Sequence, residues 1–577
     1  MKKWLKYVKP YTKYFILGPL SMAVEVVGEI VMPFLLSVII NKAEAGTLTV
    51  QNSIFIGVLM VVVALLMMAG GIGGSYYGAK ASVNFAADVR RDVYKKIQSF
   101  SFSNIDRFST GSLVTRTTND ITQIQNFVNM LLRMAIRSPG MLIGALIMAI
   151  SLNPSLATVF YVSVPLMLIA IGVLILMGFP RFQKMQSKID ELNNTVQENI
   201  SNQRVIKSFV SEEHENKKFK KANSALKNAG MSAMRVLIFM HPVTTLFMNL
   251  TIIAVVWFGS KMVLSGTMPV GDLSAFVNYV TQILFSLMMI TVLLVTSSRA
   301  LASAKRIREV LDEKVDINDL ASKNKDARIT NGNIVFKNVS FRYYKNSADK
   351  VLNDIDLEIK GGSTVGIIGS TGCGKTTLVS MIPRLYDVDQ GEVLIDEINV
   401  KDYSLYNLRE DVGMVLQNNM LFSGTIEDNL KWGDMQCTDE EMIQASESAQ
   451  AHKFVSSFEK GYDTELGQGG SNVSGGQKQR LCIARALLKK PKILILDDST
   501  SAVDTATEAL IRNAFANELK GTTKIIIAQR ISSVMDADKI IVMNEGSITG
   551  VGTHSELIES NEEYKEIYES QISGKGV

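Results

Sequence analysis

The chain has 577 residues, of which 47% are hydrophobic, and a formal net charge of only +4. This length is too great for a single domain. The sequence contains no basic arm and no interleaving of aromatic with basic residues, so we expect no nucleic-acid partner. Its three cysteines, Cys373, Cys437 and Cys482, all lie in the more polar second half and indicate reduced thiols rather than a disulfide framework.

Apolar residues are concentrated in the first half of the chain, where they form six long runs. Each run approaches or exceeds the roughly 20 residues that a helix needs to cross a bilayer. The runs are Phe15–Ile40, Ile54–Ala79, Ile136–Leu152, Leu156–Gly178, Val236–Leu264 and Leu273–Thr296. The sequence therefore predicts an all-α transmembrane domain with six spans, embedded in a lipid bilayer.

The distribution of Lys and Arg predicts the orientation of these spans. The segments Lys80–Arg137 and Arg181–Arg235 are long and basic, whereas the connections at the opposite ends of the spans are short and nearly uncharged. Because basic loops stay on the cytoplasmic side, we expect both termini to be cytoplasmic in a multi-pass protein of the cell membrane. Helices that continue through the two basic segments would form cytoplasmic arms.

Two carboxylates lie inside the first span. Glu25 and Glu29 are one turn apart, on the same face of the expected helix. Ionisable groups inside a bilayer are costly and usually face a cavity, so we predict that both glutamates line a substrate cavity and favour cationic amphipathic cargo. The alternative is that they pair with an arginine or with polar residues of another helix.

A phosphate-binding loop follows in the second half of the chain. The pattern G-x-x-x-x-G-K-[ST] lies between the strand-like Thr364–Ile368 and a helix-like stretch that begins near Leu378. Inward-turned backbone N–H groups would hold the phosphates, Lys375 would reach the β and γ oxygens, and the Thr376 hydroxyl would ligate Mg²⁺. The expected ATP-binding residues of this loop are Gly369, Ser370, Thr371, Gly372, Cys373, Gly374, Lys375, Thr376 and Thr377.

Two further strand-like runs carry the residues expected to act on the γ-phosphate. The run Lys492–Asp497 ends in a carboxylate placed to hold Mg²⁺, and Asp498 follows where most such ATPases have a glutamate that polarises the attacking water. After the run Ile525–Ala528 the chain has Gln529 where a histidine normally meets the γ-phosphate. The sequence thus predicts a site that binds ATP and is poorly equipped to hydrolyse it alone.

The segment Val473–Arg480 resembles the signature of ATP-binding-cassette (ABC) proteins. Its residues Ser474, Gly475, Gly476 and Gln477 would sit at a helix N-terminus, where the dipole and free N–H groups favour a γ-phosphate. The resemblance assigns further roles: Tyr343 stacks on adenine, Gln417 reaches Mg²⁺ and the attacking water, and Ser501–Asp504 is the D-loop, which ends in Asp504.

The resemblance covers essentially the whole chain and implies a half-transporter of the ABC exporter type. It implies a transmembrane domain at 1–313 with two coupling arms, a linker at 314–330, and an α/β P-loop nucleotide-binding domain at 331–577. The segments Phe108–Arg116 and Glu198–Glu212 resemble the two intracellular loops of such exporters, in which short coupling helices dock on nucleotide-binding domains. ATP and Mg²⁺ are the implied cofactors.

Asp498 and Gln529 make the chain most similar to the degenerate half of bacterial heterodimeric multidrug exporters. One chain has one phosphate loop and one signature, which cannot fold back onto its own loop, so each ATP requires two chains. The expected partner is a second, different half-transporter that carries the missing glutamate and histidine. The implied function is ATP-driven export of small amphipathic or hydrophobic compounds. The alternatives are an ATP-binding regulatory subunit without export of its own, and an exporter of lipids or peptides.

Overall fold

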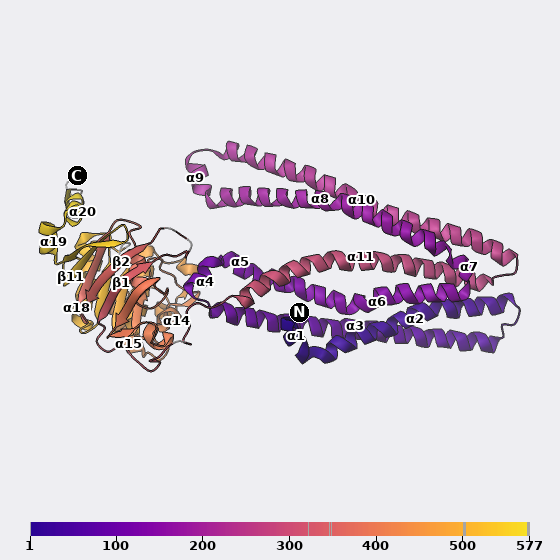
Figure 1. Ribbon diagram of the computed structural model, residues 1–577, viewed down its shortest axis with the longest axis horizontal. Helices are drawn as coiled ribbons and strands as arrows, with labels where there is room; N and C mark the ends of the chain where they lie inside the picture. Colours follow the sequence, from indigo (N-terminus) through magenta and orange to yellow (C-terminus); the bar gives the residue numbers. More distant parts are fainter. Residues whose placement is uncertain (1, 321, 346, 348, 500–502, 574–577) are drawn as a thin grey trace. The chain divides into compact units, whose positions relative to one another are not determined.

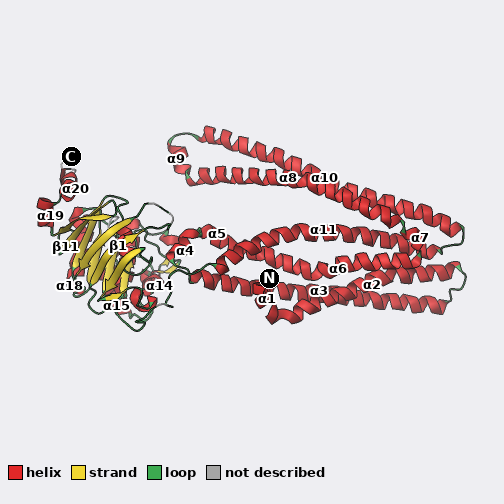
Figure 2. Ribbon diagram, viewed as in Figure 1, coloured by secondary structure: helices red, strands yellow, loops and turns green. Residues whose placement is uncertain are grey.

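The computed structural model describes residues 2–320, 322–345, 347, 349–499 and 503–573 (Figure 1). The chain divides into two compact units. The first comprises residues 1–97 and 111–312 and is helical, and the second comprises residues 98–110 and 313–577 and contains all the described strands (Figure 2). This confirms the expected fold class, a helical membrane domain followed by an α/β nucleotide-binding domain.

Six helical segments of the first unit are long and apolar enough to cross a membrane, and each contains one of the six predicted spans. The helices run beyond these apolar stretches, as expected for arms. The elements are α1 (Lys2–Val8), η1 (Lys9–Tyr11), α2 (Thr12–Glu44), α3 (Val50–Gln98), α5 (Thr110–Thr115), η2 (Arg116–Asp120), α6 (Ile121–Leu152), α7 (Pro154–Ala157), α8 (Val159–Ser201), α9 (Gln203–Ser208), α10 (Glu212–Leu264) and α11 (Val270–Asp312).

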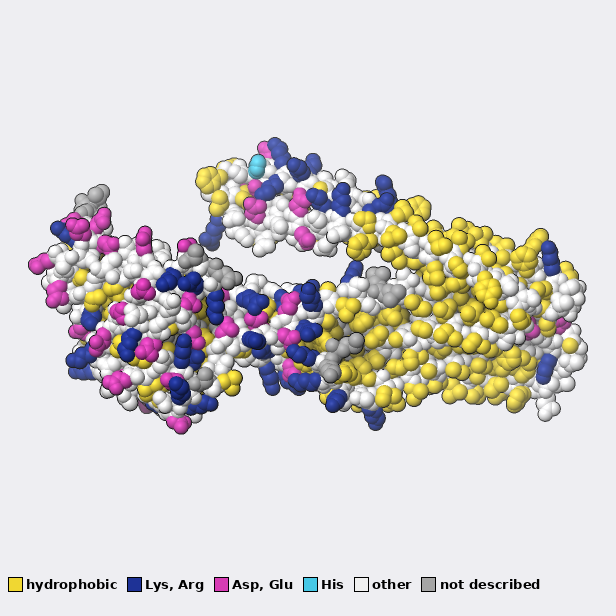
Figure 3. Space-filling model, viewed as in Figure 1, with side chains coloured by type: hydrophobic (Ala, Val, Ile, Leu, Met, Phe, Trp, Pro, Cys, Tyr) yellow, Lys and Arg dark blue, Asp and Glu magenta, His cyan; other side chains and the backbone are white. Residues whose placement is uncertain are grey.

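Figure 3 shows hydrophobic side chains over the right-hand stretch of these helices, whereas charged side chains gather toward their left-hand ends. Within the most apolar stretch of each span, only 11% to 31% of the residues are buried by the protein itself. An apolar surface of this extent is not stable against water, and it matches the hydrocarbon core of a bilayer. The first unit is therefore a membrane domain, with lipid as the solvent for most of its side chains.

Polar contacts join the helices that lie together in this domain. Helices α2, α6 and α11 pack against one another, and α8 packs along α10. Asp120, at the start of α6, is 3% exposed and accepts hydrogen bonds from Arg306 Nε (2.7 Å) and Ser303 Oγ (2.9 Å) of α11. The ion pair that Arg306 forms with Asp120 compensates the burial of this carboxylate, so it fixes α6 against α11.

Helix α3 approaches α2 closely because glycines face it. A Cβ atom on Gly70 would lie 2.8 Å from the Ser21 carbonyl oxygen, and one on Gly74 would lie 2.5 Å from the Met22 side chain. Backbones that approach in this way gain van der Waals contact where the bilayer offers no hydrophobic driving force between helices. The spacing of these glycines along α3 therefore sets its packing on α2.

The second unit contains two main sheets and a small two-stranded sheet that pairs β7 with β8. One sheet has the order β2-β1-β4-β5, and the other has the order β12-β11-β3-β10-β9-β6. The strands are β1 (Ile334–Phe341), β2 (Leu352–Ile359), β3 (Thr364–Gly369), β4 (Gln390–Ile395), β5 (Ile398–Asn399), β6 (Val412–Val415), β7 (Gly424–Thr425), β8 (Glu465–Leu466), β9 (Ile493–Asp497), β10 (Thr523–Ile527), β11 (Lys539–Asn544) and β12 (Ser547–Gly552).

Ten helices belong to this unit within the described part of the chain. They are α4 (Phe102–Arg107), α12 (Lys375–Ser380), α13 (Leu405–Glu410), α14 (Ile426–Lys431), α15 (Asp439–Ser448), α16 (His452–Val455), α17 (Gly475–Leu488), α18 (Thr505–Glu518), α19 (His554–Ser560) and α20 (Glu562–Ser573). Short 3-10 turns connect several of them, namely η3 (Gly461–Asp463), η4 (Gln468–Gly470) and η5 (Ile531–Ser533).

The turn of the first arm packs within the second unit, although the expected division placed it in the membrane domain. Tyr386 Oη donates a hydrogen bond to Asp106 Oδ2 (2.7 Å), and the Tyr386 ring contacts the ring of Phe102 with centroids 6.0 Å apart. The expected linker 314–330 contains no helix or strand in its described residues. It lies against the same unit, because Ile317 and Ile329 are buried.

The close approach of α2 and α3 gives a test of this packing. We expect Gly70→Ala to destabilise the membrane domain by about 1–3 kcal/mol, because the new Cβ atom would meet backbone atoms that cannot move aside. Thermal unfolding of the purified protein in detergent measures the change. Gly57→Ala on the same helix is the matched control, since a Cβ atom there meets nothing within 4 Å. Equal unfolding temperatures for the two variants would contradict this account.

Candidate nucleotide-binding site

The phosphate loop lies between β3 and α12, as the pattern predicts. Gly372 and Gly374 have φ values of +86° and +99°, a region that side-chain-bearing residues rarely adopt. Gly369 ends β3, and a Cβ atom there would lie 2.0 Å from the Met543 carbonyl oxygen of β11. The glycines of the motif therefore give the loop both its curvature and its contact with the neighbouring strand.

Lys375 spans this loop. Its Nζ atom donates hydrogen bonds to the carbonyl oxygens of Gly369 and Ser370, both at 2.8 Å, and lies 3.7 Å from Cys373 Sγ. The Cys373 side chain is 4% exposed and points into the protein rather than toward the open side of the loop. Lys375 therefore supplies a positive charge where the β and γ phosphates of a nucleotide would lie.

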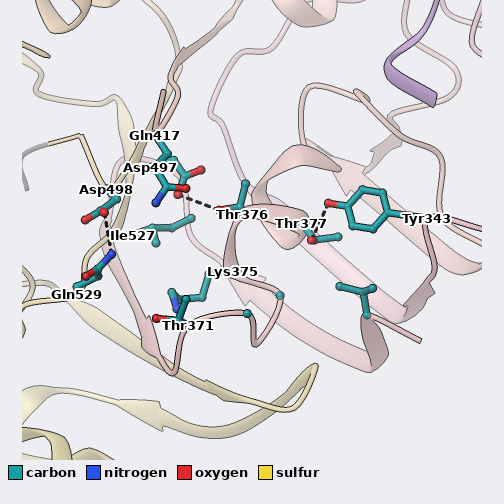
Figure 4. A pocket seen from close by; sticks show the side chains of 13 residues that line it. Tyr343, Thr371, Lys375, Thr376, Thr377, Gln417, Asp497, Asp498, Ile527 and Gln529 are labelled. Carbon is teal, nitrogen blue, oxygen red and sulfur yellow. Dashed lines mark hydrogen bonds between the residues drawn. The ribbon is translucent and has the colours of Figure 1, made fainter. Parts of the chain in front are cut away.

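Asp497 lies at the end of β9, facing the first turn of α12. Thr376 Oγ1 donates a hydrogen bond to Asp497 Oδ1 (3.1 Å), whereas Asp497 Oδ2 is buried and accepts no hydrogen bond from a described residue (Figure 4). Burial raises the pKa of Asp497, and neighbouring Asp498 acts in the same direction, against the hydrogen bond from Thr376. A buried carboxylate oxygen without a donor beside a threonine hydroxyl fits a divalent cation, so this pair can hold Mg²⁺.

The two substituted residues contact each other. Gln529 Nε2 donates a hydrogen bond to Asp498 Oδ2 at 2.9 Å (Figure 4). The backbone also holds both residues, because Asp498 N donates to the Ile527 carbonyl oxygen (3.0 Å) and Gln571 Nε2 donates to the Gln529 carbonyl oxygen (2.8 Å). Asp498 has a φ value of +49°, which is uncommon for a residue other than glycine. The amide of Gln529 thus donates to one of the two carboxylate oxygens of Asp498, which a water molecule would otherwise use as a hydrogen-bond acceptor.

Tyr343 closes the opposite side of the site. Its hydroxyl is hydrogen-bonded to Thr377 Oγ1 (2.9 Å), and its ring meets those of Phe341 and Tyr386 edge-on, at 5.1 and 5.2 Å between centroids. The side chain is nevertheless 43% exposed. A ring fixed in orientation with an open face is suited to stacking on a purine.

These residues line one cavity of about 410 Å³. The predicted residues that it brings together are Tyr343, Thr371, Gly372, Gly374, Lys375, Thr376, Thr377, Gln417, Asp497, Asp498 and Gln529. Gly369, Ser370 and Cys373 belong to the loop but do not line the cavity. Val351 and Ile527 also line it and were not predicted. Ile527 ends a strand whose pattern was recognised, whereas Val351 lies in no motif.

The signature residues and Asp504 are not among the described residues that line this cavity. Ser474 caps α17 with a capping box: Gln477 N donates to Ser474 Oγ (3.3 Å), and Ser474 N donates to Gln477 Oε1 (2.9 Å). Asp504 caps α18, and hydrogen bonds from Thr507 hold the pKa of Asp504 below its usual value. The D-loop residues Ser501 and Ala502 lie outside the described residues.

Glu25 and Glu29 lie in the membrane domain, on α2. Both form ion pairs with Arg137 of α6, whose Nη2 atom lies 3.3 Å from Glu25 Oε1 and 2.6 Å from Glu29 Oε1. The structure therefore contains the arginine pairing that the sequence left open as the alternative. Their contact with cargo remains a prediction.

Comparisons with known proteins agree with this architecture. Residues 15–288 match the family model of the ABC transporter transmembrane region, and residues 352–501 match that of the ABC transporter. The uncharacterized ABC transporter ATP-binding protein YfiB of Bacillus subtilis (strain 168) is 38% identical, covering 100% of this chain and 99% of that protein. The putative multidrug export ATP-binding/permease protein YgaD of the same organism is 32% identical, covering 99% of both chains.

A solved structure has the same fold. The structure of a bacterial Atm1-family ABC exporter with ATP bound matches with a TM-score of 0.78, covering 98% of each chain at 23% sequence identity. At this identity the likeness concerns the arrangement of helices and strands and carries no argument about cargo.

The orientation of Tyr343 generates a test of nucleotide binding. We expect Tyr343→Ala to weaken binding of a fluorescent ATP analogue about tenfold or more, because the stacking ring is lost. Tyr343→Phe should stay within about threefold, since it loses only the hydrogen bond to Thr377. Tyr344→Ala is the matched control, because the adjacent ring is 72% exposed and does not line the cavity. Unchanged affinity in Tyr343→Ala would show that Tyr343 does not contribute to nucleotide binding.

Proposed function

The chain belongs to the ABC transporter family, and on that premise we propose that it is one half of a heterodimeric, ATP-driven exporter whose own ATP site is degenerate. The single observation that carries this proposal is the hydrogen bond from Gln529 to Asp498, which joins the two residues expected to act on the γ-phosphate. Export itself and the membrane location follow from the family and from the six apolar helices.

In this proposal the nucleotide site faces the cytoplasm of a bacterial cell. The basic segments that continue the spans support this orientation, since cytoplasmic loops carry the excess of Lys and Arg. ATP would stack on Tyr343 and extend its phosphates over the loop toward Lys375. Mg²⁺, which neutralises phosphate charge when bound, would be held by Thr376 and Asp497, with Gln417 on the same wall of the cavity.

Two features of Asp498 support slow hydrolysis at this site. Aspartate is one methylene shorter than glutamate, which withdraws the carboxylate by roughly 1.5 Å, about one C–C bond. The Gln529 amide also occupies one of its oxygens. Loss of a positioned general base commonly costs about 10²–10⁴ in rate, or roughly 3–5 kcal/mol. A homodimer would contain this defect twice, which is why we propose a different partner chain.

The signature supports the requirement for two chains. Ser474 and Gly475 are exposed at the N-terminus of α17 and do not line this chain's own cavity. Their helix N-terminus has the N–H groups and dipole that favour a γ-phosphate. In the proposed dimer, this chain's signature closes the partner's ATP site, where hydrolysis occurs, and the partner's signature closes the site on Lys375, where ATP is held for long periods.

Exposed apolar side chains support the same assembly. Val205 lies in α9 and is 54% exposed. Phe209 and Val210 directly follow the end of α9 and are 76% and 81% exposed. The second unit exposes the side chains of Met420, Phe422, Trp432 and Met435, and the rings of Phe422 and Trp432 stack with centroids 4.3 Å apart. Exposed apolar surfaces of this kind indicate interfaces, and we expect each to meet the second half-transporter.

For cargo we propose small amphipathic or hydrophobic compounds. The relative named as a putative multidrug exporter supports this class. The alternative, a regulatory subunit that binds ATP without exporting, is favoured by the same Asp498–Gln529 pair. Transport into inverted membrane vesicles, measured for each chain alone and for both together, separates the two, because a purely regulatory chain would leave the partner able to export by itself.

The asymmetry of the two sites is testable in the purified complex. We expect Gln477→Ala in this chain to reduce ATP turnover strongly, because it damages the signature that closes the hydrolysing site. Asp498→Asn should change total turnover little, since the site that contains it contributes little. The phosphate release rate at saturating ATP measures both effects.

The capping box of α17 requires a control for that experiment, because Gln477→Ala also removes a hydrogen bond to the Ser474 backbone. Glu556→Ala breaks the equivalent capping box of α19, formed with Thr553, and lies outside the signature. It should lose comparable stability, about 1 kcal/mol, and retain turnover. Abolished hydrolysis in Asp498→Asn, or full-rate pumping by this chain alone, would contradict the asymmetric dimer.

The oligomeric state gives a separate test. We expect the ATP-hydrolysing form to have the mass of two half-transporters, because a single chain cannot place a signature on its own phosphate loop. Light scattering in detergent, coupled to an ATPase assay of the same fractions, measures this. A monomeric mass with ATP bound and full activity is incompatible with the proposal.

A further inference from the structure

A network of polar side chains joins three helices in the interior of the membrane domain. It comprises Glu25 and Glu29 of α2, Arg137 of α6, and Tyr279 and Gln282 of α11, and we refer to these five residues as the polar knot. Tyr279 Oη donates to the Ile30 carbonyl oxygen (2.8 Å), and Gln282 Nε2 donates to the Glu29 carbonyl oxygen (2.9 Å). Polar groups placed midway along membrane helices are costly and are usually functional.

Charge is not balanced within the polar knot. Two carboxylates face one guanidinium, and among the described residues Arg137 is the one cation that forms an ion pair with either glutamate. Glu29 Oε1 accepts a hydrogen bond from Arg137 Nη2 at 2.6 Å, whereas Glu25 Oε1 lies 3.3 Å from the same atom, within ion-pair distance. The Glu25 and Glu29 side chains are 13% and 20% exposed, whereas Arg137 is 37% exposed. Arg137 is thus the most accessible of the three charged groups, and the two glutamates do not engage all of its N–H donors.

Two buried acceptors in the polar knot have no donor. Glu25 Oε2 and Gln282 Oε1 are inaccessible to solvent and accept no hydrogen bond from a described residue. A buried acceptor left unsatisfied is destabilising, and more so when it is charged. The polar knot therefore lacks both hydrogen-bond donors and positive charge. A protonated amine supplies both, whereas an anion does not.

Packing against α3 adds a spatial constraint. The Cβ atom that an alanine would place at Gly71 lies 3.2 Å from Glu25 Oε2, so the glycine allows the Glu25 carboxylate to lie close against the α3 backbone. Two residues away on α3, Gly73 approaches Ser21 of α2 in the same manner. The glutamate carboxyl group is therefore seated between helices, where water competes little for it.

From these observations we propose that the polar knot binds the head group of the cargo, and that this head group is a protonated amine with N–H donors. The inference rests on the proposed export function and specifies its substrate class. Arg137 acts as an internal counter-ion to the two glutamates. When cargo binds, some of their carboxylate oxygens accept hydrogen bonds from the ammonium group instead of from Arg137. The amine donates to carboxylate and amide oxygens, while its apolar body lies among the hydrophobic side chains of the helices.

The requirement for donors separates this proposal from simple attraction of cations. A quaternary ammonium group carries the same charge but has no N–H, so it leaves the unpaired acceptors unsatisfied. Hydrogen bonds that involve charged groups are the stronger ones, and their loss in a site shielded from water costs at least about tenfold in affinity. Probes that share one body and differ only in head group distinguish these cases.

The test uses monodansylcadaverine, its N-trimethylated derivative and its N-acetylated derivative, which carry a primary ammonium, a quaternary ammonium and a neutral amide. Fluorescence anisotropy gives the dissociation constant of each with the purified assembly in detergent. We expect the ammonium probe to bind at least about tenfold more tightly than either derivative. Glu25→Gln should abolish this preference, because it removes the negative charge and supplies a donor of its own.

Arg137→Gln provides a measurement of opposite sign. Removal of the competing guanidinium should tighten binding of the ammonium probe, by about threefold or more, whereas a merely structural role would weaken it. Glu44→Gln is the matched control: this glutamate ends α2 and accepts a hydrogen bond from Val270 N (3.1 Å), outside the polar knot, so its loss should leave all three constants unchanged. If Arg137→Gln does not fold, Glu29→Gln keeps the proposal testable: it should weaken binding of the ammonium probe alone, whereas a merely structural role would weaken binding of all three probes.

Equal affinities for the ammonium and acetylated probes would overturn the inference, as would an undiminished ammonium preference in Glu25→Gln or an absence of measurable binding. Transport of the same probes into vesicles separates this result from the export proposal. Transport of all three without a head-group preference leaves export standing and removes the polar knot as its site. Tight, Glu25-dependent binding without any transport would leave the polar knot standing as a binding site and would contradict the export proposal.

Discussion

The parallel pairing of β10 with both β3 and β9 is the constraint on which the nucleotide site depends. Ile527, the last residue of β10, lies opposite Ile367 of β3 and opposite Asp497 of β9. Because parallel strands end at the same edge of a sheet, this register brings the phosphate loop, the Asp497 carboxylate proposed to hold Mg²⁺, and Gln529 to one place. A shift of one residue in either pairing would separate these groups by about 3.3 Å and invert their side chains.

The same register explains why the two unusual residues meet. Asp498 is the first residue after β9 and Gln529 lies two residues after β10, so the adjacent strands deliver them side by side. The Gln529 amide donates its hydrogen bond directly to the Asp498 carboxylate. The pair therefore forms one unit, and the proposed slow hydrolysis would belong to both residues together.

In the membrane domain, hydrogen bonds between side chains also join separate elements, but the surroundings differ from those of the nucleotide site. Its lipid-facing surface is apolar, so the few polar groups inside it have no water with which to exchange hydrogen bonds. Asp120 and Arg306 lie outside the predicted spans, where Arg306 is 46% exposed, and hydrogen bonds from Arg306 and Ser303 satisfy Asp120 and fix α6 to α11. Within the spans, the polar knot around Glu25 is not fully satisfied by the described residues. This difference supports the proposal that the polar knot binds a ligand, whereas the Asp120 ion pair is structural.

The sequence by itself determined the features that depend on neighbouring residues in the chain. Hydrophobic run length gave the six spans, the glycine pattern located the phosphate loop, and Ser474 with Gln477 marked the start of α17. It also indicated that Asp498 and Gln529 are substituted. Only the tertiary structure decided what these residues contact. Arg137 reaches Glu29 across 108 positions and Tyr386 reaches Asp106 across 280. Local patterns reflect backbone geometry and the solvent that a segment meets, whereas such partners depend on how helices and strands pack, which no short window of sequence contains.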